Sequence, residues 1–157
     1  GANSGLEGNA RFREEFEWMG TRDITPWLAV PVALEFMGTV LPGGWDEVRA
    51  RNNALVVEAR NLLIDTLNIT PPCPDAMLGS LAALHLPEIK ALKPSVATSA
   101  LGLDPIQEAL FHDHKIEVPV LVCPESGGRI FRVSAQLYNT IDDYARLAKA
   151  LQQYINA

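Results

Sequence analysis

The sequence contains little cysteine and no long apolar run. Its two cysteines, Cys73 and Cys123, lie far apart and form no Cys-x-x-Cys pair, which argues against a disulfide framework and a zinc site. No stretch reaches the roughly 18 apolar residues that cross a bilayer, and no signal peptide pattern opens the chain. Lysine and arginine are dispersed and the net charge is −6, so nucleic acid is not an expected partner. We therefore expect a cytoplasmic protein without membrane contact.

The remaining composition is that of an ordinary globular protein. Hydrophobic residues make up 48% and charged residues 20% of the 157 positions, which is enough for one core. Apolar periodicity predicts strands over 77–86, 115–122 and 129–134, and helices over about 25–37, 45–67, 105–112 and 141–155. Because strands and helices do not alternate regularly, the expected fold is α+β, with an antiparallel-rich sheet packed against helices.

Three segments carry more detailed expectations. Segment 11–18 alternates charged residues with aromatics and is predicted to be extended, with the aromatics pointing inward. The helix over 25–37 is apolar nearly all round, which predicts burial between larger bodies. On the helix over 45–67, Arg49, Glu58 and Arg60 lie largely off the apolar stripe and should face solvent. Asp104-Pro105 and Thr140 with Asp143 have the pattern of helix starts.

An arginine on the last predicted strand is the first candidate functional residue. Arg132 alternates with apolar neighbours, and a guanidinium with five donors must face water, an acid or a ligand anion. On residues alone, Arg132 is either solvated or paired with an acid such as Glu125. The segment then reads Ser134, Tyr138, Asn139 and Thr140. Asn139 either orients the arginine or closes the turn, and Tyr138 is expected to pack.

A second candidate motif, Gly20-Thr21, precedes a predicted helix. Glycine allows close approach of the backbone to an anion, the threonine hydroxyl donates, and the start of a helix at Thr25-Pro26 offers N–H groups. This is a physical recipe for phosphate binding. A generic turn held by an Arg22–Asp23 pair is the alternative.

These two motifs resemble a known family. The pattern Arg132-x-Ser134 followed by Tyr138-Asn139-Thr140, together with the run from Phe16 through Gly20-Thr21-Arg22-Asp23 to Pro31, is similar to class V pyridoxal-phosphate-dependent aminotransferase-family enzymes, and most fully to their isopenicillin N epimerase-like branch. The resemblance covers nearly the whole chain. It implies the small C-terminal domain of a fold type I enzyme.

The resemblance also implies roles and an organisation. Arg132 and Asn139 would contact the carboxylate of an amino acid substrate, and Gly20 and Thr21 the phosphate of pyridoxal 5′-phosphate in the neighbouring subunit of a homodimer. Residues 1–44 would lead out of the large domain, and residues 45–157 would form the small C-terminal domain. The chain looks like a C-terminal fragment whose parent performs an epimerisation, transamination or lyase step.

The chain lacks the remaining parts of that chemistry. The family needs a lysine that binds the cofactor, an acid beside the pyridine nitrogen and a ring stacked on the cofactor, and all three precede the matched segment. The chain alone is therefore expected to be inactive. Two alternatives stay open: a cysteine desulfurase or lyase type of enzyme, and a non-catalytic module that binds an anion or a partner. The apolar surroundings of Cys123 argue against sulfur transfer.

The histidines give no separate indication of a site. His112 and His114 are in reach of one metal ion but have no third ligand, and a helix C-terminus favours histidine in any case. His85 alternates within an apolar strand and is expected to be structural. No metal is predicted.

Overall fold

A computed structural model describes residues 5–17, 22–93, 102–123 and 126–156. The chain divides into two compact units, Gly1–Gly44 and Trp45–Ala157. The role of either unit within a larger enzyme stays a prediction.

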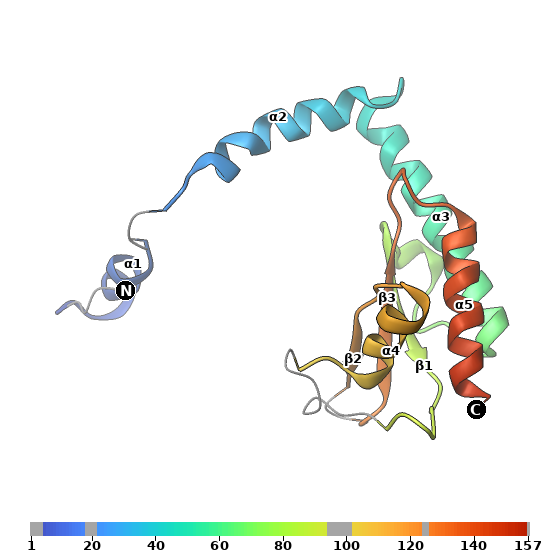
Figure 1. The fold of residues 1–157 in the computed structure, drawn as a ribbon. Helices are drawn as coiled ribbons and strands as arrows, with labels where there is room; N and C mark the ends of the chain where they lie inside the picture. Colours follow the sequence, from blue (N-terminus) through green and yellow to red (C-terminus); the bar gives the residue numbers. More distant parts are fainter. Residues whose placement is uncertain (1–4, 18–21, 94–101, 124–125, 157) are drawn as a thin grey trace. The chain divides into compact units, whose positions relative to one another are not determined.

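The first unit begins with a helix where an extended segment was predicted. Helix α1 spans Gly8–Glu17 (Figure 1), so that prediction was wrong. Residues four apart lie on one helix face: Arg11 pairs with Glu15 at 2.7 Å, and the rings of Phe12 and Phe16 are 4.9 Å apart. A spacing of four fits both a strand and a helix, which is why the alternation misled. Both aromatic side chains are exposed rather than inward.

The second helix of this unit, α2, spans Thr25–Thr39 and confirms the helix predicted there. No residue of α2 is buried by the described part of the chain, and Trp27 and Phe36 are 66% and 65% exposed. The expected burial between larger bodies is thus not provided by these residues. In the described ranges no single helix is long and apolar enough to cross a membrane, and only α2 counted together with the next helix, α3 (Gly44–Leu67), passes that test by length and composition.

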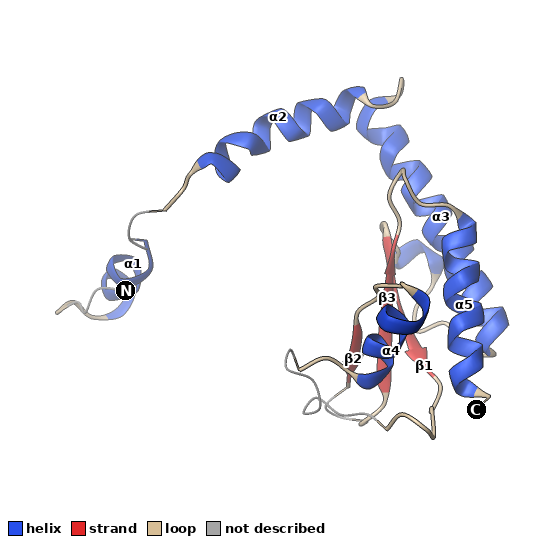
Figure 2. Ribbon diagram, in the orientation of Figure 1, coloured by secondary structure: helices blue, strands red, loops and turns tan. Residues whose placement is uncertain are grey.

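In its described residues, the second unit contains a three-stranded antiparallel sheet covered on one face by helices (Figure 2). The strands β1 (Leu81–Leu86), β2 (Val120–Val122) and β3 (Arg129–Ser134) have the order β1-β3-β2. The helices are α3 (Gly44–Leu67), α4 (Pro105–His114) and α5 (Ile141–Ile155), with a short 3-10 turn, η1 (Asp75–Met77), before β1. The α+β fold with an antiparallel sheet is therefore confirmed.

The two faces of the sheet differ in burial. Ala82, Leu84, Phe131 and Val133 join a core with side chains from α3, α4 and α5. The opposite face exposes Leu81, Ala83 and His85 from β1, Leu121 from β2, and Arg132 and Ser134 from β3. We call this second surface the open face. Each strand thus alternates between the core and the open face, as expected for a sheet covered on one side.

Two predicted strands prove shorter than expected. The chain before β1 forms η1 instead of strand, and the chain before β2 begins with the end of α4. There Lys115 has φ 56 and its N–H donates to the carbonyls of Leu110 and Phe111, which closes the helix. The apolar alternation over 115–122 therefore covers both the strand β2 and the extended segment that precedes it. The hairpin of β2 and β3 is confirmed.

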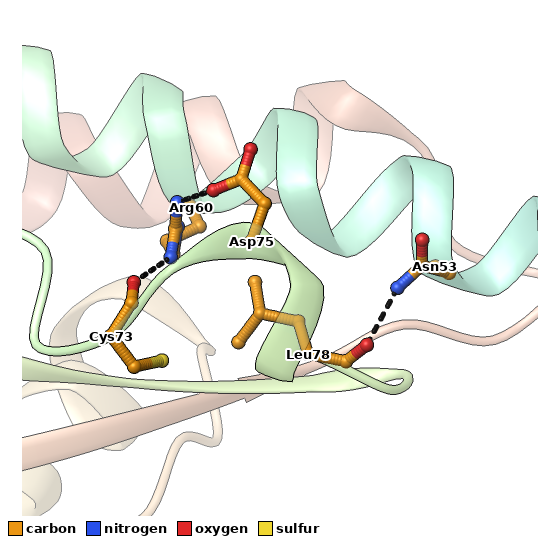
Figure 3. A network of polar contacts seen from close by, with 5 residues as sticks. All are labelled: Asn53, Arg60, Cys73, Asp75 and Leu78. Atoms are coloured by element: carbon orange, nitrogen blue, oxygen red, sulfur yellow. Dashed lines mark hydrogen bonds and ion pairs between the residues drawn. The ribbon is translucent and has the colours of Figure 1, made fainter.

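A buried arginine on α3 corrects another prediction. Arg60 was expected to face solvent but is 3% exposed. Figure 3 shows its side chain reaching the Cys73 carbonyl, at 2.8 Å, and the Asp75 carboxylate, while Asn53 donates to Leu78 at 2.8 Å. The two α3 side chains thereby hold the loop that leads into β1. The partners of Arg60 lie in this loop, outside α3. The spacing of apolar residues along α3 therefore could not indicate that Arg60 is buried.

The start of α5 is built as the sequence predicted. Thr140 is the N-cap residue and forms a capping box with Asp143, whose carboxylate accepts from the Thr140 N–H at 3.0 Å. We expect Asp143→Ala to lower the free energy of unfolding by about 1 kcal/mol because this donor loses its partner. Asp142→Ala removes the same charge from the same turn and is the matched control. Equal losses in urea unfolding would assign the effect to charge alone.

Candidate functional site

Arg132 and Asn139 line one pocket of the second unit. The pocket has a volume of about 280 Å³ and lies where the segment before β2 and the start of α5 meet β3. Tyr138, Tyr144 and Glu117 also line it. The structure thus brings together the two residues predicted to contact a substrate carboxylate.

The backbone holds Arg132 on the open face, on the central strand. Its Cα pairs with that of Ala83 on β1, and its N–H donates to the Pro119 carbonyl at 3.2 Å. The guanidinium forms no hydrogen bond or ion pair with any residue that the structure describes. Glu125, the alternative partner, lies outside the described residues. A fixed positive charge on an open sheet surface beside a pocket is suited to bind a carboxylate.

Asn139 uses its side chain to close the turn before α5. Its Oδ1 accepts from the Gln136 N–H at 3.0 Å, and its Nδ2 lies 3.5 Å from an Asp143 carboxylate oxygen. The turn-closing alternative is therefore seen directly. Tyr138, predicted to pack, is 82% exposed, so that prediction was wrong. It stands at the pocket as an aromatic wall rather than as a core residue.

Tyr144, on α5, connects this side of the pocket to β3 by a hydrogen bond. Its hydroxyl donates to the Ser134 carbonyl at 2.8 Å. Burial raises the pKa of Tyr144, and the charges of Asp143 and Tyr138 act in the same direction. The phenol therefore stays a neutral donor at physiological pH, and it fixes α5 against the strand that carries Arg132.

The predicted phosphate motif, Gly20 and Thr21, lies outside the described residues. The helix start that was to assist it is described, and its N–H groups are already used. The Thr25 N–H donates to Asp23 at 2.9 Å, and the N–H groups of Trp27 and Leu28 donate to Ile24. Pro26 has none. The expectation of free N–H groups at this helix start was therefore wrong.

Asp23 has a role of its own at this helix start. Its carboxylate accepts from both the hydroxyl and the N–H of Thr25, at 2.5 and 2.9 Å, and these bonds lower the pKa of Asp23. Arg22 lies over the Trp27 ring, with its guanidinium carbon 5.9 Å from the ring centroid. The N-cap residue of α2 is Ile24, which makes no side-chain cap hydrogen bond, and Asp23 instead binds the N–H of Thr25 in the first turn.

Sequence reasoning missed a buried ion pair between Asp104 and Arg129. Their side chains are 1% and 3% exposed, and Arg129 Nε lies 2.9 Å from Asp104 Oδ2. The other carboxylate oxygen caps α4 by accepting from the Ile106 N–H at 3.0 Å. The signal was available, because Arg129 alternates in phase with Phe131, which faces the core.

The histidine cluster at the end of α4 forms a contact with α5 instead of a metal site. The structure describes no group of three His, Cys, Asp or Glu side chains that could hold a metal ion. Asp113 accepts from the Tyr154 hydroxyl at 2.8 Å, and the His114 ring packs edge-on against Tyr154. Burial, followed by the hydrogen bond and charge of Asp113, raises the pKa of Tyr154 to about 12.

The raised pKa of Tyr154 predicts alkaline destabilisation. The unfolded phenol ionises near its ordinary value of 10.0, whereas the folded one keeps its proton to about 12. The stabilisation is therefore complete below pH 10 and lost as the pH rises from 10 to 12. In urea unfolding across this range, Tyr154→Phe should show a shallower decline than the unaltered chain. Asp113→Asn should flatten the decline as well, and an unchanged slope in both variants would contradict this assignment.

Comparison with known proteins extends these observations. No family model matches the chain. It is 36% identical over 137 residues to isopenicillin N epimerase of Streptomyces clavuligerus, covering 86% of this chain and 30% of the relative. It is 34% identical over 139 residues to isopenicillin N epimerase of Amycolatopsis lactamdurans, covering 87% and 31%. It is also 34% identical over 143 residues to a probable chloroplastic L-cysteine desulfhydrase of Arabidopsis thaliana, covering 87% and 29%.

The fold, the Arg132 segment and these relatives define the class of protein. The chain belongs to the class V pyridoxal-phosphate-dependent enzyme family. Within it, the similarity is to isopenicillin N epimerases and L-cysteine desulfhydrases, as the sequence resemblance predicted for the first of these. The chain spans 29% to 31% of the length of these relatives.

Proposed function

We propose that this chain is the C-terminal portion of a pyridoxal-phosphate-dependent enzyme acting on amino acids, and that Arg132 holds the substrate carboxylate. The observation that carries the proposal is the guanidinium of Arg132 on the open face, which has no hydrogen-bond or ion-pair partner among the described residues and belongs to the lining of a pocket of about 280 Å³. Carboxylate recognition by arginine is bidentate, so it fixes orientation as well as position. The described donors fit a substrate carboxylate, while Gly20 and Thr21 would hold the cofactor phosphate of a partner subunit.

The residues of this chain would position the reaction rather than perform it. Pyridoxal phosphate, when bound, accepts the electron pair released at the substrate Cα. Arg132 would hold the carboxylate so that one bond at Cα is presented for cleavage. The Tyr144 hydroxyl keeps α5 fixed to β3, and the Asn139 side chain keeps the adjoining turn closed. A loss of either contact would move the pocket wall rather than remove a reacting group.

The first test is a spectrum of a longer polypeptide that contains this chain and an N-terminal cofactor-binding part. Purified with pyridoxal phosphate, it should show a visible absorption band that borohydride removes, and the 157-residue chain should not. A longer polypeptide without such a band would overturn the proposal. The predicted cytoplasmic location would be checked on the same polypeptide by fractionation.

A second candidate reaction is favoured by the names of several relatives. One 34% identical relative is a probable L-cysteine desulfhydrase, so the longer polypeptide is assayed both for lyase activity on L-cysteine and for epimerase activity. Hydrogen sulfide release from L-cysteine would support the lyase, and racemisation of an amino acid at constant concentration would support the epimerase. Cys123 lies in the β2 to β3 connection, half-buried, with its N–H donating to Gly128.

The proposed sharing of sites in a homodimer predicts complementation. Arg132→Ala should reduce kcat/KM of the longer polypeptide about 10- to 100-fold, because a charged hydrogen bond is worth about 1.5–3 kcal/mol. Thr21→Ala should weaken cofactor binding. If Thr21 serves the cofactor of the other subunit, mixing the two impaired variants should restore one fully working site per mixed dimer. No recovery, with mixed dimers shown by mass, would contradict shared sites.

A further inference from the structure

We propose that Glu117 is a second anchor in the Arg132 pocket and that the pocket selects a dipolar ligand, which bears a cationic group in addition to its carboxylate. This inference rests on the proposed function for the assignment of the carboxylate to Arg132. It adds a role for Glu117, which would bind a cationic group of the same ligand. Glu117 and Arg132 both belong to the described residues.

The strand geometry places Glu117 and Arg132 on the same side of the sheet. The hydrogen bond from the Arg132 N–H to the Pro119 carbonyl shows that the chain before β2 continues alongside β3. Along this segment Val118 is 4% exposed and points into the core, whereas Glu117 is exposed. Side chains alternate between faces in extended chain, so Glu117 lies on the open face with Arg132. Both line the same pocket.

Glu117 and Arg132 belong to the lining of one pocket and do not pair with each other. Among the described residues, neither Glu117 nor Arg132 forms a side-chain hydrogen bond or an ion pair. Asp143, the other acid of the pocket, already accepts from the Thr140 N–H. The pocket therefore presents one uncommitted cation and one uncommitted anion.

Apolar residues in the lining of the same pocket suit a short aliphatic chain. Pro119, Leu147 and the ring of Tyr138 line the pocket together with the two charged side chains. A ligand with a carboxylate at one end and an ammonium group at the other would satisfy both. Under the proposed function the α-amino group is bonded to the cofactor, so Glu117 would recognise an additional cationic group on the substrate side chain. The substrate class is then an amino acid with a second amine.

Three probes of matched length separate the two anchors. 5-Aminovalerate carries both charges, valerate the carboxylate alone, and pentylamine the amine alone. Titrated into the labelled 157-residue chain, each is followed by the amide shifts of Arg132 and Ser134. We expect 5-aminovalerate to bind about 2- to 5-fold more tightly than valerate, the range for an exposed ion pair, and pentylamine to bind most weakly.

The variants assign the difference to Glu117. Glu117→Gln should make 5-aminovalerate bind no better than valerate and leave valerate affinity unchanged, whereas Glu58→Gln, a matched exposed acid on α3, should change neither. Tighter binding of both carboxylates in Glu117→Gln would show that Glu117 merely competes for Arg132, and would overturn the proposal. So would equal affinities in the unaltered chain, or no binding of any probe.

The two proposals fail in different ways. The absence of a borohydride-sensitive band in the longer polypeptide would overturn the enzyme assignment and leave the preference for 5-aminovalerate in this chain untouched. Conversely, a cofactor-loaded enzyme whose kcat/KM for a diamino acid is unchanged by Glu117→Gln would overturn the role of Glu117 alone.

Discussion

Replacing Asp104 by alanine should lower the free energy of unfolding by about 3–5 kcal/mol, because the variant leaves the buried Arg129 guanidinium without its partner. The two side chains are 1% and 3% exposed, so water cannot replace the missing carboxylate. The same variant also removes the cap on the Ile106 N–H at the start of α4. Since a domain of this size is stabilised by about 5–15 kcal/mol in total, the second unit would become marginal.

Two further variants separate the charge from the cap. Asp104→Asn keeps an oxygen for the Ile106 N–H but removes the charge opposite Arg129, so most of the loss should remain. The double variant Asp104→Leu with Arg129→Met removes both buried charges and should recover much of the stability. If Asp104→Asn unfolded at the same urea concentration as the unaltered chain, the ion pair would have no net role and the cap would carry the effect.

The second large effect is expected one residue away from the candidate site. Phe131 is 1% exposed and belongs to the core between the sheet and its helices. Phe131→Ala should lower the free energy of unfolding by about 3–5 kcal/mol, because it removes apolar contacts and leaves a cavity. Urea unfolding followed by the circular dichroism of the helices would measure it.

The neighbouring residue is the matched control, because it belongs to the opposite face. Arg132→Ala on the open face should change stability by less than about 0.5 kcal/mol while weakening carboxylate binding about 10- to 100-fold. Of these two adjacent residues on β3, we therefore expect Phe131 to contribute to stability and Arg132 to ligand binding. A stability loss in Arg132→Ala comparable to that in Phe131→Ala would mean that Arg132 is a structural residue.

Local signals accounted for most of the fold. The sequence Asp104-Pro105 marks the start of α4, and Thr140 with Asp143 marks that of α5, because the residues that cap these helices are adjacent in the chain. Alternation identified β3 and the hairpin for the same reason. The prediction of an extended conformation was wrong over 11–17, because aromatics four residues apart lie on one face of a strand and of a helix alike.

Long-range partners could not be inferred in this way. Arg60 bonds the Cys73 carbonyl and the Asp75 carboxylate, and nothing in the pattern of α3 distinguishes it from a solvent-facing arginine. Within the candidate site, Arg132 was found through its place in a motif. Glu117 was not, because its relevance depends on the path of the chain before β2 rather than on its sequence neighbours.

During folding, the open face is complete only after β1 has paired with β3. The hairpin of β2 and β3 joins segments that are near in the chain, and such contacts close within microseconds. β1 is separated from β3 by α4 and β2, so its docking requires closure of a much longer loop, which slows folding. Ala83, which lies opposite Arg132, arrives with that late strand. In a refolding chain the β2–β3 hairpin should therefore form first, and the open face beside Arg132 should be completed only when β1 docks.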